Sequence, residues 1–348
     1  MSELLKRLKV ESNPLIDDDE VLFVWEGETA PYLHLETNQF QAVEMQRIEP
    51  DVWTYQIQLP PEAYIEYNFA TEANDPDTIV IDPHNTNVAD TGVGHDNHYF
   101  KMPHRVHTPY IMERYGIQKG TITDHTINFG LFGSNHERDV WLYQPATDEP
   151  VPLLVVLDGK DYMERGKLVT IVDNMIDDGK IQPIALAMID NAYEHRMIEY
   201  NQNETIPVLL HNTLLPLAQK HLNLLDVKDN PSAYGILGAS MGGLMALYIG
   251  LRMPDIFGKV ITQAGAFFTY DDGREALIHV LVDLLPTAPL NIWLDCGIYD
   301  FLYDFNRDMR QRLANKGYEV SYAEHAGGHN YTSWRDLLPN ALETLFGV

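Results

Sequence analysis

The spacing of apolar residues changes near residue 118, and this change limits the fold more than any other feature of the sequence. Beyond residue 120, short apolar runs alternate with stretches of helical spacing. The runs expected to form strands are 153–157, 184–189, 234–237, 260–263, 291–296 and 320–324. The stretches expected to form helices are 168–178, 206–221, 241–253, 304–315 and 333–346. Such alternation predicts a mostly parallel sheet flanked by helices, with chemistry on the loops at the carboxyl ends of the strands.

Residues 21 to about 100 instead follow a two-residue period. Apolar side chains that share one strand face are Trp53, Tyr55, Ile57 and Leu59, and a second set is Ile65, Tyr67 and Phe69. Several short strands without a helix between them predict a small all-β sandwich. We therefore expect two domains, a β-sandwich over 1–118 and an α/β domain over 119–348.

Composition limits the classes of partner. The chain has 348 residues, with 24 Lys and Arg against 51 Asp and Glu, so its formal net charge is −27. Such a charge repels phosphate backbones and anionic lipid, which argues against nucleic-acid and membrane-surface partners. Assembly into a homo-oligomer remains a possibility that the sequence does not decide. The one cysteine, Cys296, excludes an internal disulfide, and the start of the chain has no apolar leader. We expect a cytoplasmic protein.

A candidate nucleophile stands where a predicted strand meets a predicted helix. Residues 238–242 are Gly-Ala-Ser-Met-Gly, a G-x-S-x-G motif in the context in which this motif carries chemistry. The turn must be sharp, so the serine takes strained backbone angles and the flanking glycines let strand and helix approach. We predict Ser240 as the nucleophile.

A serine hydroxyl needs a base to take its proton. In this architecture the order along the chain is serine, acid, histidine. The histidines after Ser240 are His279, His325 and His329. His279 lies within a predicted helix and His325 at a strand end, whereas His329 lies in a glycine-rich loop before the last helix. We predict His329 as the base.

The acid should follow the predicted strand 291–296. Asp300 lies in the loop after it, with Asp304 and Asp295 as alternatives. Asp295 is within the strand, and Asp304 starts a helix, where an acidic residue is common for electrostatic reasons. We predict that Asp300 orients the imidazole and stabilises its protonated form, and the choice between Asp300 and Asp304 stays open.

The developing oxyanion needs two amide donors. The first is expected from Met241, directly after the nucleophile. The second is expected from the loop after strand 153–157, where Gly159 leaves room for a carbonyl oxygen, and the donor is the amide of Lys160 or that of Gly159. This chemistry requires no metal and no organic cofactor.

Four histidines between residues 95 and 107 raise the question of a metal site. They are His95, His98, His104 and His107. Imidazoles bind zinc and nickel, but these histidines lack a helical i, i+4 pair and a completing carboxylate. We therefore expect a loop-like linker at the domain junction.

The motifs of the second domain together resemble a known family. Residues 155–159, 238–244, 252–258, 297–300 and 327–330 are similar, in this order, to the Putative esterase family of α/β-hydrolases. That family includes enterochelin esterase, esterase D, feruloyl esterases and mycobacterial mycolyltransferases. The resemblance covers about 120–348 and implies an α/β-hydrolase fold and serine ester hydrolysis. Arg196 and Glu199 resemble its Arg-x-x-Glu stretch, which we interpret as loop structure more than chemistry. We interpret Asp158 and Asp161 as loop-structuring residues as well, and we also keep Arg196 and Gly159 as candidate substrate contacts.

The first domain resembles the early-set β-sandwich of enterochelin esterases and the glycogen-binding modules of glycan enzymes. Trp53, the strand around Tyr67 and residues 82–85 carry this resemblance. The pairing of domains implies a siderophore or a similar small ester or lactone as substrate. A ferric catecholate is an anion, so it would need positive charge in the pocket. The basic candidates are Arg138, Lys160, Arg165 and Arg196.

Three other functions stay open. A feruloyl or acetyl sugar esterase would use the same residues on another ester. Acyl transfer to an alcohol instead of water would also use them. A glycan-binding protein on an inactive hydrolase scaffold would use none of this chemistry.

Overall fold

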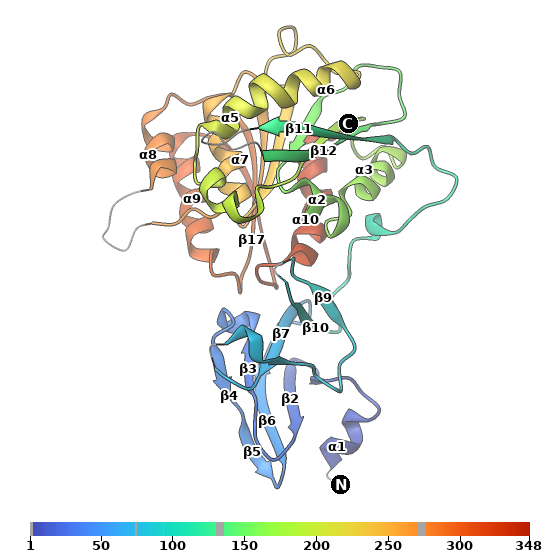
Figure 1. Cartoon of the computed structure of the whole chain (residues 1–348), viewed down its shortest axis with the longest axis vertical. Coiled ribbons are helices and arrows are strands. Elements are labelled where there is room, and N and C mark those ends of the chain that lie inside the picture. The colour runs from blue at the N-terminus through green and yellow to red at the C-terminus, as the bar shows by residue number, and fades with distance from the viewer. Residues whose placement is uncertain (1–2, 74, 93, 130–135, 270–275) are drawn as a thin grey trace. The chain divides into compact units, whose positions relative to one another are not determined.

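A computed structural model describes residues 3–73, 75–92, 94–129, 136–269 and 276–348 (Figure 1). The chain divides into two compact units. The first comprises Met1–His107, Gly297–Phe301 and Glu324–Ser333, and the second comprises Thr108–Cys296, Leu302–Ala323 and Trp334–Val348. The loops that carry Asp300 and His329 thus belong to the first unit.

The first unit is a β-sandwich preceded by helix α1 (Glu3–Leu8). One sheet has the order β1-β2-β6-β5, built from β1 (Leu15–Asp17), β2 (Glu20–Glu26), β6 (Val52–Gln58) and β5 (Gln46–Glu49). The other has the order β4-β3-β7-β10-β9, built from β4 (Ala42–Glu44), β3 (Tyr32–Leu35), β7 (Tyr64–Ala70), β10 (Asp96–Lys101) and β9 (Val88–Asp90). Strand β8 (Ile79–Val80) pairs with β7.

Aromatic side chains from both sheets fill the sandwich. The Phe23 ring lies 5.0 Å from Tyr67 and 5.6 Å from Phe100, centroid to centroid. The core also takes in Ala326, and Tyr299 packs against it from the other late loop. Both predicted sets contact this core: Ile65, Tyr67 and Phe69 are buried in it, and Trp53, Tyr55 and Ile57 pack against it while partly buried.

The second unit contains an eight-stranded sheet with the order β11-β12-β14-β13-β15-β16-β17-β18. Its strands are β11 (Thr121–Phe129), β12 (His136–Gln144), β13 (Leu153–Val156), β14 (Ala185–Ile189), β15 (Tyr234–Ala239), β16 (Phe257–Gln263), β17 (Asn291–Gly297) and β18 (Glu319–His325). Pairing is parallel from β14 through β17. Strands β11 and β12 add an antiparallel edge.

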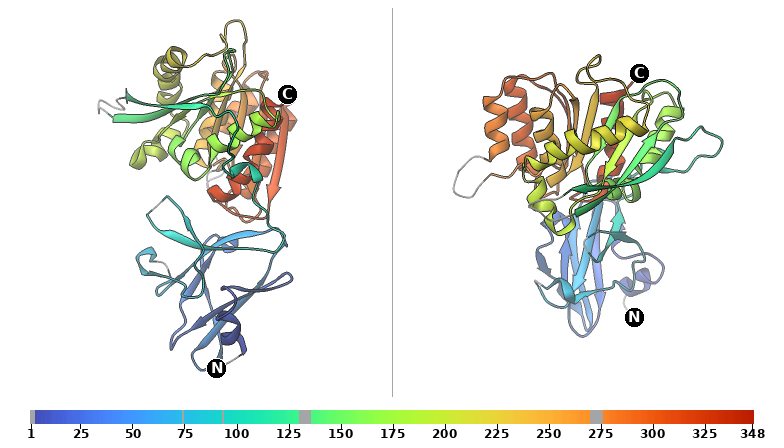
Figure 2. Two further views of the ribbon diagram at one scale, coloured as in Figure 1. Left: turned by 90° about the vertical axis from the view of Figure 1, so that its right-hand side faces the viewer. Right: turned by 45° about the horizontal axis from the view of Figure 1, so that its top comes forward.

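Helices lie on both faces of this sheet, with α6 and α10 on opposite faces (Figure 2). The helices are α2 (Gly159–Glu164), α3 (Leu168–Asp177), α4 (Arg196–Tyr200), α5 (Thr205–Leu209), α6 (Leu215–His221), α7 (Met241–Arg252), α8 (Leu277–Leu284), α9 (Tyr303–Lys316) and α10 (Tyr331–Phe346). Short 3-10 turns are η1 (Glu36–Asn38), η2 (Pro76–Thr78), η3 (Pro109–Ile111) and η4 (Tyr193–His195). Within the described ranges, no helix has the length and apolar character needed to cross a membrane.

Two expectations need correction. The helix expected over 206–221 is divided by a π turn, η5 (Leu210–Leu214), because Pro216 has no N–H to continue the α-helical ladder. The segment around His98 is not a plain loop, since β10 pairs with β7 and β9. There the Nε2 atom of His98 accepts a hydrogen bond from the Asp82 N–H at 2.9 Å. Among the described residues, no cluster of three or more His, Cys, Asp or Glu side chains could hold a metal ion.

Candidate active site

Ser240 forms a sharp turn between strand β15, which ends at Ala239, and helix α7, which begins at Met241. Its backbone angles are φ 57° and ψ −123°, a region that residues with a side chain rarely adopt. The Ser240 N–H donates to the Gln263 carbonyl at 2.9 Å, and the Ser240 carbonyl accepts from the Ala266 N–H at 2.9 Å. The neighbouring strand β16 and the loop after it therefore hold the strained conformation in place.

The first glycine of the motif is required by close packing. A Cβ on Gly238 would lie 2.3 Å from the backbone oxygen of Gly242. No side chain fits in that space, so the strand and the start of the helix approach as closely as the motif predicts.

Asp300 and His329 lie together in the first unit. The Nδ1 atom of His329 is 2.8 Å from the Oδ2 atom of Asp300. The Asp300 side chain is fully buried, and the His329 side chain is 23% exposed. A carboxylate can only accept in such a contact, so we assign the donated proton to Nδ1, the tautomer in which Nε2 of an imidazole can take up a proton. This arrangement suits a general base whose orientation is fixed by an acid.

The alternative acids, Asp304 and Asp295, and the other histidines after Ser240 lie in different environments from Asp300 and His329. Asp304 is exposed in the first turn of α9. Asp295 is buried within β17, where its Oδ2 atom accepts from Trp293 Nε1 at 2.7 Å and from Gln263 Nε2 at 3.0 Å. His279 is buried on α8, and His325 ends β18.

The two predicted oxyanion donors both begin helices of the second unit. Met241 is the first residue of α7, and Lys160 follows Gly159, the first residue of α2. The first amides of a helix have no carbonyl partner within it, so both can donate outward. A helix N-terminus also favours negative charge.

An ion pair connects the α2 loop to the nucleophile turn. Arg196 donates to both carboxylate oxygens of Asp158 at 2.7 Å, and Asp158 directly precedes Gly159. Arg196 also reaches the carbonyl of Ala239 at 3.4 Å, directly before Ser240. The guanidinium therefore holds two loops of the candidate site, whereas a contact of Arg196 or Gly159 with substrate stays a prediction.

Two more of the basic candidates also have acidic partners. Arg138 and Glu199 form a buried ion pair at 2.5 Å. Arg165 lies 2.7 Å from Asp161. The carboxylates balance these guanidinium charges, and Lys160, the fourth candidate, is exposed. Three of the four basic candidates are thus neutralised by a carboxylate, so the four do not form a pocket of unbalanced positive charge.

Sequence reasoning missed Glu36, a buried carboxylate of the first unit. It is 2% exposed and accepts a hydrogen bond from Asn330 Nδ2 at 2.8 Å. Burial, together with the nearby charge of Glu66, raises the pKa of the Glu36 carboxyl well above its usual range. A glutamate after a strand normally lies in solvent, so the sequence gives no signal for this contact.

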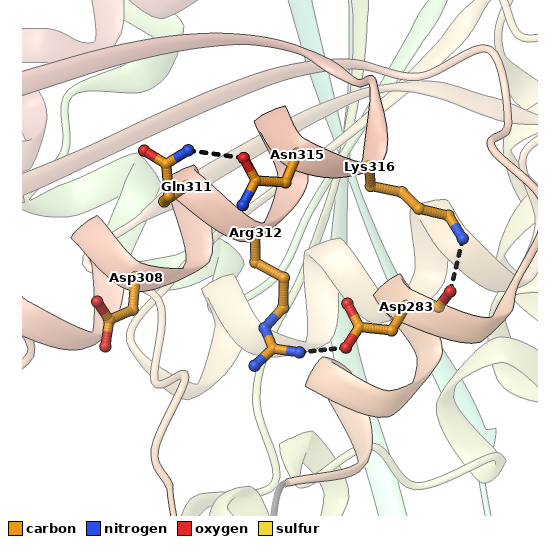
Figure 3. Close-up of a pocket in the computed structure, with 6 residues that line it drawn as sticks. All are labelled: Asp283, Asp308, Gln311, Arg312, Asn315 and Lys316. Atoms are coloured by element: carbon orange, nitrogen blue, oxygen red, sulfur yellow. Dashed lines mark hydrogen bonds and ion pairs between the residues drawn. The ribbon is translucent and has the colours of Figure 1, made fainter.

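A separate hollow lies on the surface of the second unit, between α8 and α9 (Figure 3). Its lining residues are Asp283, Asp308, Gln311, Arg312, Asn315 and Lys316. An ion pair joins Arg312 to Asp283, and Lys316 Nζ donates to the Asp283 carbonyl at 2.6 Å. None of the residues predicted for catalysis or for the oxyanion site lines this hollow.

Comparison with known proteins gives a family match and several relatives. The family model described as Putative esterase matches residues 133–345. An iron(III) enterobactin esterase of Dickeya dadantii is 33% identical over 219 residues, covering 58% of this chain and 50% of that protein. An endo-1,4-beta-xylanase/feruloyl esterase of Xylanibacter ruminicola is 26% identical over 186 residues, covering 52% of this chain and 24% of that protein. The match thus spans half or less of these two curated relatives.

Solved structures show the fold. The ferric enterobactin esterase of Salmonella typhimurium superposes with a TM-score of 0.80 at 21% identity, covering 99% of this chain and 98% of that one. The enterobactin esterase of Shigella flexneri, solved in the presence of enterobactin, gives a TM-score of 0.78 at 22% identity, with the same coverage. An α/β-hydrolase fold with an N-terminal β-sandwich is therefore confirmed.

Proposed function

Because the chain belongs to the Putative esterase family, we propose that it is a serine carboxylic ester hydrolase that works through an acyl-enzyme. The observation that carries this proposal is the strained turn at Ser240, with φ 57°, inside a G-x-S-x-G motif between strand and helix. The 2.8 Å contact between His329 and Asp300 supports it by supplying an oriented base.

In the proposed mechanism the Ser240 oxygen attacks the ester carbonyl while His329 Nε2 takes the hydroxyl proton. Asp300 stabilises the imidazolium that forms. The amides of Met241 and Lys160 donate to the oxyanion. The imidazolium then gives its proton to the departing alcohol, leaving an acyl-serine. His329 then takes a proton from water, whose oxygen attacks the acyl carbonyl. The bond to the Ser240 oxygen breaks, the imidazolium returns the proton to that oxygen, and the acid is released. We propose water as the acceptor over a second alcohol.

For the substrate class we propose a small ester or lactone of the siderophore type. The support is the similarity to enterobactin esterases over both the family region and the whole fold. A cytoplasmic location and the oligomeric state stay predictions, which cell fractionation and light scattering would test.

A neutral sugar ester carrying a feruloyl or acetyl group is the second candidate. The observation in its favour is the negative charge of the chain, which disfavours an anionic substrate. The formal net charge is −27, and Arg138, Arg165 and Arg196 are each paired with a carboxylate. An anionic catecholate would meet repulsion that an uncharged ester would not.

Hydrolysis of a short aryl acetate by the wild-type chain and by Ser240→Ala tests the proposal, with circular dichroism to confirm matched folding. We expect the variant to lose about 10³-fold or more in kcat/KM, the scale of a triad nucleophile. Equal activity in both proteins would refute the proposal. Retained affinity for glycogen in both would then favour the glycan-binding alternative.

A substrate panel separates the two candidates. It compares a catecholate lactone, with and without iron, with feruloyl and acetyl sugars at low and high salt. A preferred anionic lactone should be hydrolysed faster as salt screens the repulsion, whereas a neutral ester should not respond.

A further inference from the structure

The loop that carries His329 rests on one buried glutamate of the sandwich. Gly328 and Asn330, the residues on either side of His329, both contact Glu36. A Cβ built on Gly328 would lie 2.2 Å from Glu36 Cγ, so the loop backbone lies directly against this side chain. Asn330 Nδ2 donates to Glu36 Oε1 at 2.8 Å.

Asn330 extends this contact to the last helix. Its Oδ1 atom accepts from the Ser333 N–H at 2.8 Å, at the start of α10. This is the hydrogen bond of a helix N-cap. The Asn330 amide therefore makes two different hydrogen bonds: its oxygen accepts from the start of α10, and its nitrogen donates to Glu36.

Glu36 is itself fixed from the other side. Its Oε2 atom accepts from the Glu66 N–H of β7 at 3.2 Å. The loop is further held where the Tyr64 N–H, also of β7, donates to the Ala326 carbonyl at 3.0 Å. The position of the loop is thus set by strand β7 and by the residue that follows β3.

We propose that Glu36 is a positioning residue for the general base, fixing the backbone on both sides of His329 so that the imidazole is held for proton transfer. This inference rests on the proposed function. A residue of the N-terminal sandwich would then contribute to the catalytic rate, although it touches no reacting atom. A misplacement of a catalytic group by about 1 Å costs about 10²-fold in rate.

The hydrogen bond from the Asn330 amide to the Glu36 carboxylate can be tested by exchanging the amide and the carboxylate between the two positions. In Glu36→Gln, one side-chain oxygen can still accept from the Glu66 N–H, but the new NH₂ group then faces the NH₂ group of Asn330. In Asn330→Asp, the helix cap is kept, but two carboxyl groups face each other, and the assay is run at alkaline pH so that both are ionised and share no proton. In the double variant, the new amide at position 36 donates to the new carboxylate at position 330, so every hydrogen bond is restored, and the one between these two side chains has its direction reversed.

Asp82→Asn is the matched control. Asp82 is an equally buried carboxylate of the same sandwich, at 2% exposure. It accepts hydrogen bonds from Tyr67 Oη at 2.6 Å and Asn13 Nδ2 at 2.7 Å, and these partners lie outside the His329 loop. A general loss of sandwich stability should therefore appear in Asp82→Asn and in Glu36→Gln alike.

The experiment measures kcat and KM for a short aryl acetate on the full chain, below the unfolding temperature of each variant. We expect Glu36→Gln and Asn330→Asp each to lower kcat about 10- to 100-fold with little change in KM. The double variant should return to within about 3-fold of wild type. Asp82→Asn should keep its kcat.

Unchanged kcat in Asn330→Asp, or a double variant no better than the two singles, would overturn the positioning role. Asn330→Asp and the double variant carry the test if Glu36→Gln does not fold. Ser240→Ala in the same assay separates the two claims. If Ser240→Ala is inactive but the Glu36 and Asn330 variants match wild type, only the positioning role fails. If Ser240→Ala is fully active, the proposed function fails.

Discussion

Replacing Arg196 by Met tests whether this arginine supports the candidate site or binds substrate. The substitution keeps a long side chain that can cover the Tyr200 ring, which now lies 5.1 Å from the guanidinium. It removes both 2.7 Å hydrogen bonds to Asp158. Asp158 is 1% exposed, so its charge would stay buried without the guanidinium, while the Asn191 amide would still donate to it at 3.0 Å.

The magnitude follows from this burial. Breaking a fully buried ion pair costs about 3–5 kcal/mol. The Arg196 side chain is 23% exposed and Asn191 still donates, so we expect a loss of about 2–3 kcal/mol in the free energy of unfolding. In a unit of this size that corresponds to a fall of roughly 5 °C or more in Tm. We also expect a lower kcat, because the pair holds the loop before Lys160 against the turn at Ser240.

The assay combines thermal unfolding with aryl acetate kinetics, and Arg165→Met is the control. Arg165 pairs with Asp161 four residues earlier, and both side chains are partly exposed, so its loss should cost less than about 1 kcal/mol. Wild-type stability and a raised KM in Arg196→Met would instead show that Arg196 binds substrate and does not support the loops of the site.

Three further changes have defined outcomes. Asp300→Asn should lower kcat about 10³- to 10⁴-fold without unfolding the protein, because the 2.8 Å acceptor of the His329 Nδ1 proton is lost, while Asp304→Asn should change kcat little. Gly238→Ala should cost about 3 kcal/mol or more in urea unfolding, since its Cβ would lie 2.3 Å from a backbone oxygen; wild-type stability would contradict the tight turn. Burial raises the pKa of Glu36, so the folded chain binds more protons than the unfolded one above about pH 4.5. The free energy of unfolding should therefore fall as pH rises from about 4.5 toward the folded pKa, and Glu36→Gln should lose that component of the slope in urea titrations above about pH 4.5.

The second unit could be predicted from sequence where local pattern and buried environment agree. Strand β15 and helix α7 have buried residues almost throughout, so their apolar runs mark them clearly. The edge hairpin of β11 and β12 was not predicted. Most residues of β11 are exposed, and an exposed strand has no apolar run to mark it.

The candidate site could be predicted in part. The turn at Ser240 is local, so a five-residue motif between strand and helix suffices to find it. The burial of Glu36 beneath the His329 loop depends on contacts between residues far apart in the chain. Arg196 and Asp158 are likewise 38 positions apart, so the carboxylate partner of this arginine became visible only in the fold.

The central claim is that Ser240 is an activated nucleophile. Treatment of the wild-type chain with a fluorophosphonate, followed by peptide mass spectrometry, tests it most directly. We expect a single adduct on Ser240, with labelling strongly slowed in His329→Ala while both proteins stay folded. An adduct on another residue, or a folded wild-type chain that does not react, would contradict it.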